Sequence, residues 1–122
     1  MKYFNLCEFE CHHCGQLPDK GMNSALLAKL DELRERLGRP VIVTSGYRCP
    51  THNRNVGGVS NSQHVKGTAA DIYCPGVSVD MLADLATKVG FDGIGRYYGQ
   101  GFVHVDCRDG GNSPNGYRWK GY

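Results

Sequence analysis

The sequence lacks several features that would place it in a particular class of protein. None of its apolar runs approaches the ~20 residues that a membrane-spanning helix needs, so we expect no membrane insertion. Its net charge is only +2, and no basic run is present to neutralise phosphates, which argues against a nucleic-acid partner. The first eight residues (MKYFNLCE) contain one lysine but no apolar core, unlike a secretory signal. We therefore expect a protein that is made without a signal peptide and stays cytoplasmic until it is released.

The chain also lacks internal repeats and low-complexity tracts. Its 122 residues match the usual size of one domain, so we expect a single domain over residues 1–122. With 40% hydrophobic and 21% charged residues, the composition is that of a globular protein. Glycine accounts for 17 of the 122 residues, about twice the usual ~7%. This excess predicts many tight turns and long loops around a small core.

Cysteine is too scarce to build a disulfide scaffold, which needs ~8–10% of the residues, because only 6 of 122 are cysteines. Cys7, Cys11 and Cys14 lie with His12 and His13 in residues 1–20, a segment that we expect to be an irregular arm packed on the domain. Cys11 and Cys14 have the C-x2-C spacing of a zinc knuckle, but no second pair follows. A structural metal would need a distant fourth ligand such as Cys49, Cys74 or Cys107, and disulfides or free thiols remain open alternatives.

Two segments have the periodicity of amphipathic helices. Residues 23–38 place leucines on one face, Asn23 or Ser24 can cap the start, and Gly38 ends the helix. Residues 79–89 have a similar apolar spacing between a capping Ser78 and Gly90. The leucines of the first segment are Leu26, Leu27, Leu30, Leu33 and Leu37.

Four short β-rich runs surround these helices. Residues 41–44 predict a buried strand, and residues 68–74, 94–98 and 102–107 predict three more. A long polar loop spans residues 45–67, and loops of such length are usually functional. The glycine-rich tail, residues 108–122, has Trp119 as its expected anchor. The pattern predicts an α+β domain with a small antiparallel sheet and flanking helices.

Alternation along the predicted strands separates polar from apolar side chains. In residues 102–107, period 2 places the valines on one face and His104 with Asp106 on the other. By the same rule, Asp71 faces away from its apolar neighbours in residues 68–74, and His64 comes just before that strand. The valines belong against the core, so the polar face is expected to line a groove.

Two histidines and a carboxylate form the three-ligand set of a catalytic zinc ion, whose fourth position stays open for water. We therefore expect His64, Asp71 and His104 to bind zinc. Asp106 is our candidate for the base that takes a proton from that water. Each residue alone fits an ordinary structural role, and it is the joint pattern that indicates a metal site.

The motifs around these residues resemble those of a known family. Ser62-x-His64-x-x-Gly67-x-Ala69-x-Asp71, followed by Phe102-Val103-His104-Val105-Asp106, is similar to the M15 family of zinc D-Ala-D-Ala peptidases, whose fold is shared with the hedgehog signalling domain. Residues 44–50 (TSGYRCP), 93–97 (GIGRY) and 117–119 (YRW) also look like this family, in the same order.

The resemblance implies roles for further residues. His64, Asp71 and His104 match the zinc ligands of the family, and Arg48 matches a position expected to bind the peptide and assist catalysis, where a guanidinium suits a carboxylate. The alternative for Arg48 is a solvated loop arginine. Ser62 and Gln63 either help to bind ligands and substrate or simply form a turn.

The resemblance also contains a departure. Several members of the family have Glu or Asp three residues before the last histidine, where this sequence has Gly101. Asp106 is then the candidate base, unless it only holds the free nitrogen of His104. Tyr97 and Tyr98 would assist an oxyanion or bind substrate, and the alternative for both is packing.

The resemblance implies a zinc peptidase that hydrolyses peptidoglycan stem peptides or cross-links, as a carboxypeptidase or an endopeptidase. We expect a monomer that acts on the cell wall, either as a phage-encoded lysis enzyme or after export by another route. Two alternatives stay open. One is a non-catalytic zinc domain that binds cell wall or protein, and the other is a small structural protein whose histidines are incidental.

Overall fold

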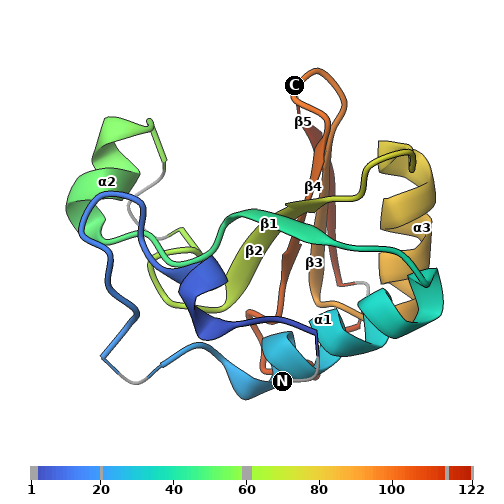
Figure 1. The fold of residues 1–122 in the computed structure, drawn as a ribbon, viewed down its shortest axis with the longest axis horizontal. Coiled ribbons are helices and arrows are strands. Elements are labelled where there is room, and N and C mark those ends of the chain that lie inside the picture. Colours follow the sequence, from blue (N-terminus) through green and yellow to red (C-terminus); the bar gives the residue numbers. More distant parts are fainter. Residues whose placement is uncertain (1–2, 20, 59–61, 115, 122) are drawn as a thin grey trace.

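In the part of the chain that the structure describes, the fold consists of five strands and four short or medium helices (Figure 1). This computed structural model describes residues 3–19, 21–58, 62–114 and 116–121. No helix within these ranges is both long and apolar enough to cross a membrane. The elements, in chain order, are η1 (Leu6–Phe9), α1 (Ser24–Leu37), β1 (Ile42–Ser45), α2 (Pro50–Asn55), β2 (Ala69–Tyr73), α3 (Val79–Val89), β3 (Gly93–Tyr97), β4 (Phe102–Asp106) and β5 (Tyr117–Gly121).

Both predicted helices are confirmed, together with their caps. The side chains of Asn23 and Ser78 each accept a backbone N–H from the first turn of α1 and α3. Gly38 and Gly90 end these helices in the left-handed conformation, with φ of 68° and 95°, which glycine adopts without steric cost. Local capping chemistry therefore sets the limits of both helices.

The sheet is mixed and has the strand order β1-β2-β4-β3-β5. The first four strands pair antiparallel, as predicted, but β5 pairs parallel with β3. The sheet is therefore mixed, where an antiparallel one was expected, and part of the glycine-rich tail forms its fifth strand. The segment between β4 and β5 carries the chain back to the level of Gly93, so β5 enters the sheet in the same direction as β3.

The carboxylate of Asp92 organises this return. It accepts backbone N–H groups from Asp109, Gly111 and Ser113, each at 2.9 Å, while its carbonyl accepts the N–H of Tyr117. The first residue of β5 is thereby fixed beside the start of β3.

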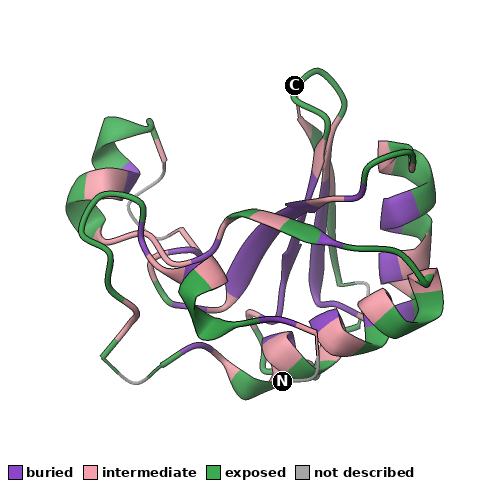
Figure 2. Ribbon diagram, viewed as in Figure 1, coloured by how far each residue is buried: buried purple, intermediate pink, exposed green. Residues whose placement is uncertain are grey.

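The expectation that residues 41–44 form a buried strand is also wrong. β1 lies at the edge of the sheet and pairs only with β2, so its side chains alternate between half-buried and exposed, and Ile42 is 36% exposed. Figure 2 shows this contrast with the central strands, which are buried along most of their length.

The long polar loop contains a helix that the sequence analysis did not predict. α2 has only six residues, with Pro50 at its first position and Cys49 as its N-cap, whose Sγ accepts the N–H of His52 at 3.4 Å. It lies at the far left of Figure 1, away from α1 and α3. Its sequence is polar, so no apolar periodicity marks it.

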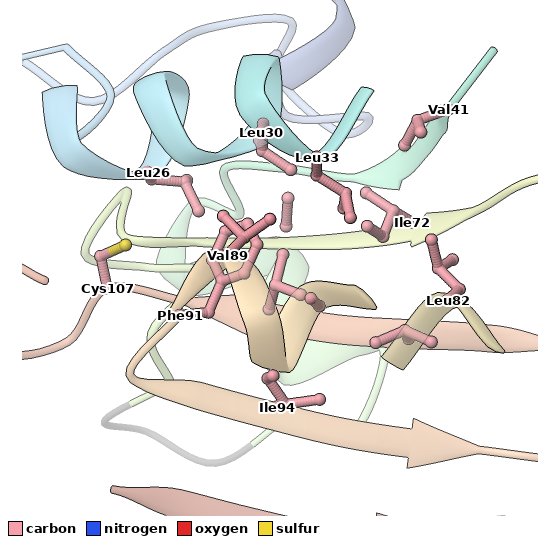
Figure 3. Close-up of a cluster of buried hydrophobic side chains, with 14 of the residues drawn as sticks. Leu26, Leu30, Leu33, Val41, Ile72, Leu82, Val89, Phe91, Ile94 and Cys107 are labelled. Atoms are coloured by element: carbon pink, nitrogen blue, oxygen red, sulfur yellow. The ribbon is translucent and has the colours of Figure 1, made fainter. Parts of the chain in front are cut away.

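The hydrophobic core lies between the sheet and the pair α1 and α3. Leucines of α1 point toward Ile72 of β2 and Phe91 (Figure 3). Val103 and Val105 of β4 are fully buried in the same cluster, as period 2 predicted. This face of the sheet is therefore occupied, and the opposite side chains of β2 and β4 are available for a site.

The N-terminal arm joins the core through two phenylalanines. Phe4 and Phe9 are buried there, and the carbonyl of Phe9 accepts the N–H of Tyr47 at 2.8 Å. A Cβ on Gly46 would lie 2.6 Å from the Cα of Phe9, so only glycine allows this approach. The arm thus lies directly against the loop that follows β1.

Candidate metal centre

The register of β2 and β4 brings the predicted ligands together. Asp71 and His104 are paired across the two strands, and both face away from the core that their neighbours fill. His64 reaches them from the turn before β2. One nitrogen of each histidine and one carboxylate oxygen of Asp71 all lie within 4.8 Å of one another. The structure thus groups the three residues that the sequence pattern singled out.

Both histidines point a ring nitrogen at the same oxygen of Asp71. His64 Nε2 lies 3.1 Å and His104 Nδ1 lies 3.2 Å from Asp71 Oδ1. The three residues are between 3% and 7% exposed, so water does little to compensate their charges and lone pairs. They form a compact set of donor atoms at the floor of a cavity.

Hydrogen bonds behind the rings fix which nitrogen is free. His64 Nδ1 lies 2.7 Å from the carbonyl oxygen of Gly46, and His104 Nε2 lies 2.7 Å from Asp106 Oδ2. Neither a carbonyl nor an ionised carboxylate can donate a hydrogen, so both of these nitrogens must donate. In neutral imidazole rings, which metal binding requires, the opposite nitrogens then present lone pairs to Asp71. Such support behind metal-binding histidines is usual.

Three lone-pair atoms that converge in this way suit a bound cation. Zinc prefers this combination of imidazole nitrogens and a carboxylate oxygen, and three protein ligands leave one position open. The donor set therefore fits a zinc ion held by His64 Nε2, Asp71 and His104 Nδ1.

The electrostatics of the cluster also favour positive charge. Burial raises the pKa of the Asp71 carboxyl, but its close contacts with the rings of His104 and His64 outweigh it and hold that pKa far below its usual range. Burial lowers the pKa of His104, but the neighbouring carboxylates of Asp106 and Asp71 favour the protonated ring and raise its net pKa. The carboxylates thus stay ionised and attract a cation to this point.

Asp106 does not lie where a base would act. It is fully buried and is not among the described residues that line the cavity. Besides the proton of His104 Nε2, its carboxylate accepts the guanidinium of Arg108 at 2.7 and 2.9 Å. Burial raises its pKa, but these hydrogen bonds hold it well below the usual range. The geometry disagrees with the expected base and matches the alternative, a carboxylate that holds the free nitrogen of His104.

A cavity of about 960 Å³ opens above the triad. The residues that the sequence analysis assigned to substrate, Arg48, Ser62, Gln63 and Tyr97, all line it, and so does Gly101. Asp71 is the one carboxylate among the described lining residues. The cavity thus has room for a peptide but offers no second acidic side chain to it.

Arg48 joins the metal site to the cavity. Its Nη2 donates to Asp71 Oδ2 at 3.2 Å, its Nε donates to Ser45 Oγ at 3.2 Å, and its side chain is 17% exposed. It is therefore not a solvated loop arginine. A guanidinium has five N–H donors, so contact with Asp71 leaves others for a ligand.

Ser62 and Gln63 hold the turn that presents His64. The hydroxyl of Ser62 accepts the N–H of His64 at 3.2 Å, and Oε1 of Gln63 accepts the hydroxyl of Thr68 at 2.9 Å. Both contacts fit the turn role, which leaves their contact with substrate a prediction.

The two tyrosines lie in different places. The hydroxyl of Tyr97 accepts the indole N–H of Trp119 at 2.9 Å beside the cavity. Tyr98 instead donates to Asp80 at 2.7 Å on the α3 side of the sheet and does not line the cavity, so an oxyanion role for Tyr98 is not supported.

Trp119 and Arg108 are site residues that sequence reasoning missed. The Trp119 ring lies 5.0 Å from the ring of His104, and Arg108 lies over the Trp119 ring at 5.3 Å while it pairs with Asp106. Trp119 was expected only as an anchor of the tail. Its place in the YRW motif was the one available signal.

The cysteines of the arm separate into two groups. Cys11 and Cys14 meet Cys49, with their sulfur atoms within 4.8 Å of one another, whereas Cys7 is exposed and lies outside this group. Burial raises the pKa of Cys11, but backbone N–H groups of Cys49, Cys14 and His13 outweigh it and lower that pKa to about 7. Of the three distant cysteines considered, the structure brings Cys49 to the arm.

Comparisons with known proteins identify the family of this chain. The sequence model of the peptidase M15 family matches residues 2–106. Zinc D-Ala-D-Ala carboxypeptidase of Streptomyces albus G is 42% identical over 67 residues, which cover 54% of this chain and 26% of that protein. The probable peptidoglycan L,D-endopeptidase MepK of Haemophilus influenzae is 30% identical over 93 residues, 70% of this chain and 50% of that protein. The chain thus spans half or less of the length of these relatives, yet the family match includes all three proposed ligands. This chain belongs to the peptidase M15 family.

Proposed function

We propose that this chain is a zinc-dependent peptidase that hydrolyses peptides of peptidoglycan. The observation that supports this most is the fixed orientation of His64 and His104, whose free nitrogens face Asp71 at the floor of a cavity. The names of the two relatives support the choice of substrate, because both are peptidases of D-amino-acid-containing or peptidoglycan peptides.

A zinc ion bound by His64, Asp71 and His104 would polarise a peptide carbonyl and lower the pKa of water to about 7. Asp106 acts as a positioning residue that keeps His104 in the required tautomer. Arg48 keeps Asp71 in place and offers its remaining N–H donors to a substrate carboxylate. Tyr97 lines the same cavity, and its hydroxyl, which accepts the indole N–H of Trp119, would donate to the peptide.

A second candidate is a non-catalytic zinc domain that binds the cell wall. One observation favours it. Gly101 stands where several family members have an acidic residue, and Asp71 is the one carboxylate among the described cavity-lining residues. The second, structural zinc ion expected at the N-terminal cysteines is a separate proposal, because it would be held by different residues.

Digestion of purified peptidoglycan, analysed by mass spectrometry, tests the proposal. We expect muropeptides to be shortened or cross-links to be cut, with activity lost in a chelator and restored by zinc. Release of terminal D-Ala would identify a carboxypeptidase, and loss of dimeric muropeptides would identify an endopeptidase. Hydrolysis that survives metal removal contradicts the zinc mechanism. An inert protein with its zinc fully bound would establish the second candidate.

A further inference from the structure

We propose that Cys11, Cys14, Cys49 and His52 bind a second, structural zinc ion, separate from the centre at His64. This inference does not rest on the proposed function, because it depends on different side chains in a different part of the molecule. It joins two segments that are far apart in the sequence, the N-terminal arm and the start of α2.

Three sulfur atoms meet in this cluster. The thiols of Cys11, Cys14 and Cys49 lie within 4.8 Å of one another, and the N–H of Cys49 donates to the sulfur of Cys11 at 3.4 Å. All six cysteines of the chain lie in described residues, and none is in a disulfide. A disulfide would pair two of these thiols and leave the third alone, whereas a zinc ion uses all three.

The fourth ligand follows from spacing and placement. Cys11 and Cys14 form a C-x2-C pair with the spacing of structural zinc sites, and Cys49 and His52 are separated by the same two residues. The His52 ring stacks near those of His12 and His13, with ring centroids 6.3 and 6.2 Å apart. These two histidines stand between Cys11 and Cys14, so the His52 ring lies near the C-x2-C turn, although the group of atoms within 4.8 Å of one another holds the three sulfur atoms without His52.

The location explains what such an ion would do. The arm has little regular structure beyond a four-residue 3-10 helix, and α2 has only six residues, too short to be stable alone. Four ligands from the two segments would lock them together, and structural zinc sites contribute directly to folding energy. None of the three cysteines is among the described residues that line the cavity, which fits a closed structural site.

Counting zinc in variants of the full chain tests the proposal. Protein purified under reducing conditions is measured by native mass spectrometry and elemental analysis. We expect two zinc ions in the wild type, one in Cys14→Ser, one in His64→Ala and none in the double variant. Cys14 is exposed, so its replacement should not disturb the core. Cys7→Ser, an exposed cysteine of the same arm outside the cluster, is the matched control and should keep both ions.

Cobalt substitution separates the two sites by spectrum. Thiolate ligands give cobalt an intense near-ultraviolet charge-transfer absorption, which should be lost in Cys14→Ser and kept in His64→Ala. A wild type with one zinc that disappears in His64→Ala would overturn the proposal but leave the peptidase centre intact. A disulfide between two of the three cysteines in freshly prepared, zinc-supplied protein would overturn it as well.

His52 has its own test. Replacement by alanine should weaken zinc at the cysteine site by at least about tenfold, in view of the 10–100-fold cost of losing even indirect support for a metal ligand. Competition with a chelator measures the affinity, and His12→Ala, an exposed neighbour in the same stack, is the control. Unchanged affinity in His52→Ala would overturn its assignment as the fourth ligand.

Discussion

The two clusters of donor atoms are built in opposite ways. His64, Asp71 and His104 are all buried, two of them on adjacent central strands, and they open onto a cavity. Cys11, Cys14 and Cys49 come from an irregular arm and a helix start, and their burial ranges from complete to exposed. The first cluster is held by a sheet that would exist without it, whereas the second lies between segments with little structure of their own.

This difference matches the two kinds of zinc site. A catalytic site needs a rigid frame and an open position, while a structural site fills all its positions with protein ligands and supplies the rigidity itself. Loss of the ion at His64, Asp71 and His104 should therefore abolish hydrolysis while the protein stays folded. Loss of the ion at the three cysteines should loosen the arm more than it slows hydrolysis.

The largest effect is expected for His64→Ala. Hydrolysis should fall at least about a thousandfold, since a metal ion supplies several kcal/mol of transition-state stabilisation. The measurement is the rate of muropeptide hydrolysis, with circular dichroism to show that the sheet remains. His12→Ala, which removes an exposed histidine outside the triad, should hydrolyse at the wild-type rate. If His64→Ala kept more than a tenth of wild-type activity, the cluster at His64 could not be the catalytic one.

Asp106→Asn should have the next largest effect. Its amide can donate as well as accept, so His104 is no longer held in the tautomer that presents Nδ1. We expect zinc affinity at the triad to fall roughly 10–100-fold, measured by competition with a chelator, and the nitrogen shifts of His104 to report a changed tautomer. The control is Asp84→Asn, which touches only a surface ion pair with Arg96 and should leave zinc affinity unchanged. An unchanged tautomer in Asp106→Asn would refute its positioning role.

Arg48→Ala should lower kcat/KM more than it lowers zinc binding. Loss of a hydrogen bond to a charged group costs about 1.5–3 kcal/mol, which corresponds to a roughly 10–100-fold lower kcat/KM. Because His64 and His104 remain, the zinc content should not change. A substrate with an amidated C-terminus tests the role directly: wild type and variant should cleave it at similar rates. A variant that still discriminates against the amide would show that another group binds the carboxylate.

The smallest effect is expected for Gly46→Ala, which lies between the two clusters. Its Cβ would lie 2.6 Å from the backbone of Phe9, and overpacking of this kind typically costs 1–3 kcal/mol. Urea unfolding measures the loss, and chelator competition should show weaker zinc at the triad, because the Gly46 carbonyl orients His64. In Gly57→Ala only backbone conformation is changed, since a Cβ there meets nothing within 4 Å. Equal zinc affinities in the two variants would argue against coupling through residue 46.

The sequence predicted best those features that depend on the pattern within a single helix or strand. Period 2 correctly assigned Val103 to the core and His104 to the site, and the caps of α1 and α3 were read directly from Asn23 and Ser78. The same rule placed Asp106 on the face of His104, but alternation gives only the face of a side chain and not the ring nitrogen that it contacts.

Features that depend on distant contacts could not be predicted. β5 is short and joins β3 after a long glycine-rich connection held by Asp92, and nothing in its local pattern indicates a parallel partner. Cys49 meets Cys11 because Phe9 anchors the arm beside Gly46, which is a tertiary contact. Trp119 reaches His104 only because β5 is in the sheet.

Four consecutive residues after β1 connect the whole arrangement. The carbonyl of Gly46 accepts from His64, the backbone of Tyr47 is bonded to Phe9, Arg48 reaches Asp71, and Cys49 contacts Cys11. The arm therefore supports the segment that carries side chains of both clusters. Deleting the arm would remove the contacts that hold Tyr47 and Cys49. Gly46 and Arg48, which contact His64 and Asp71, lie in the same tetrapeptide, so engineered versions of this domain should keep the arm.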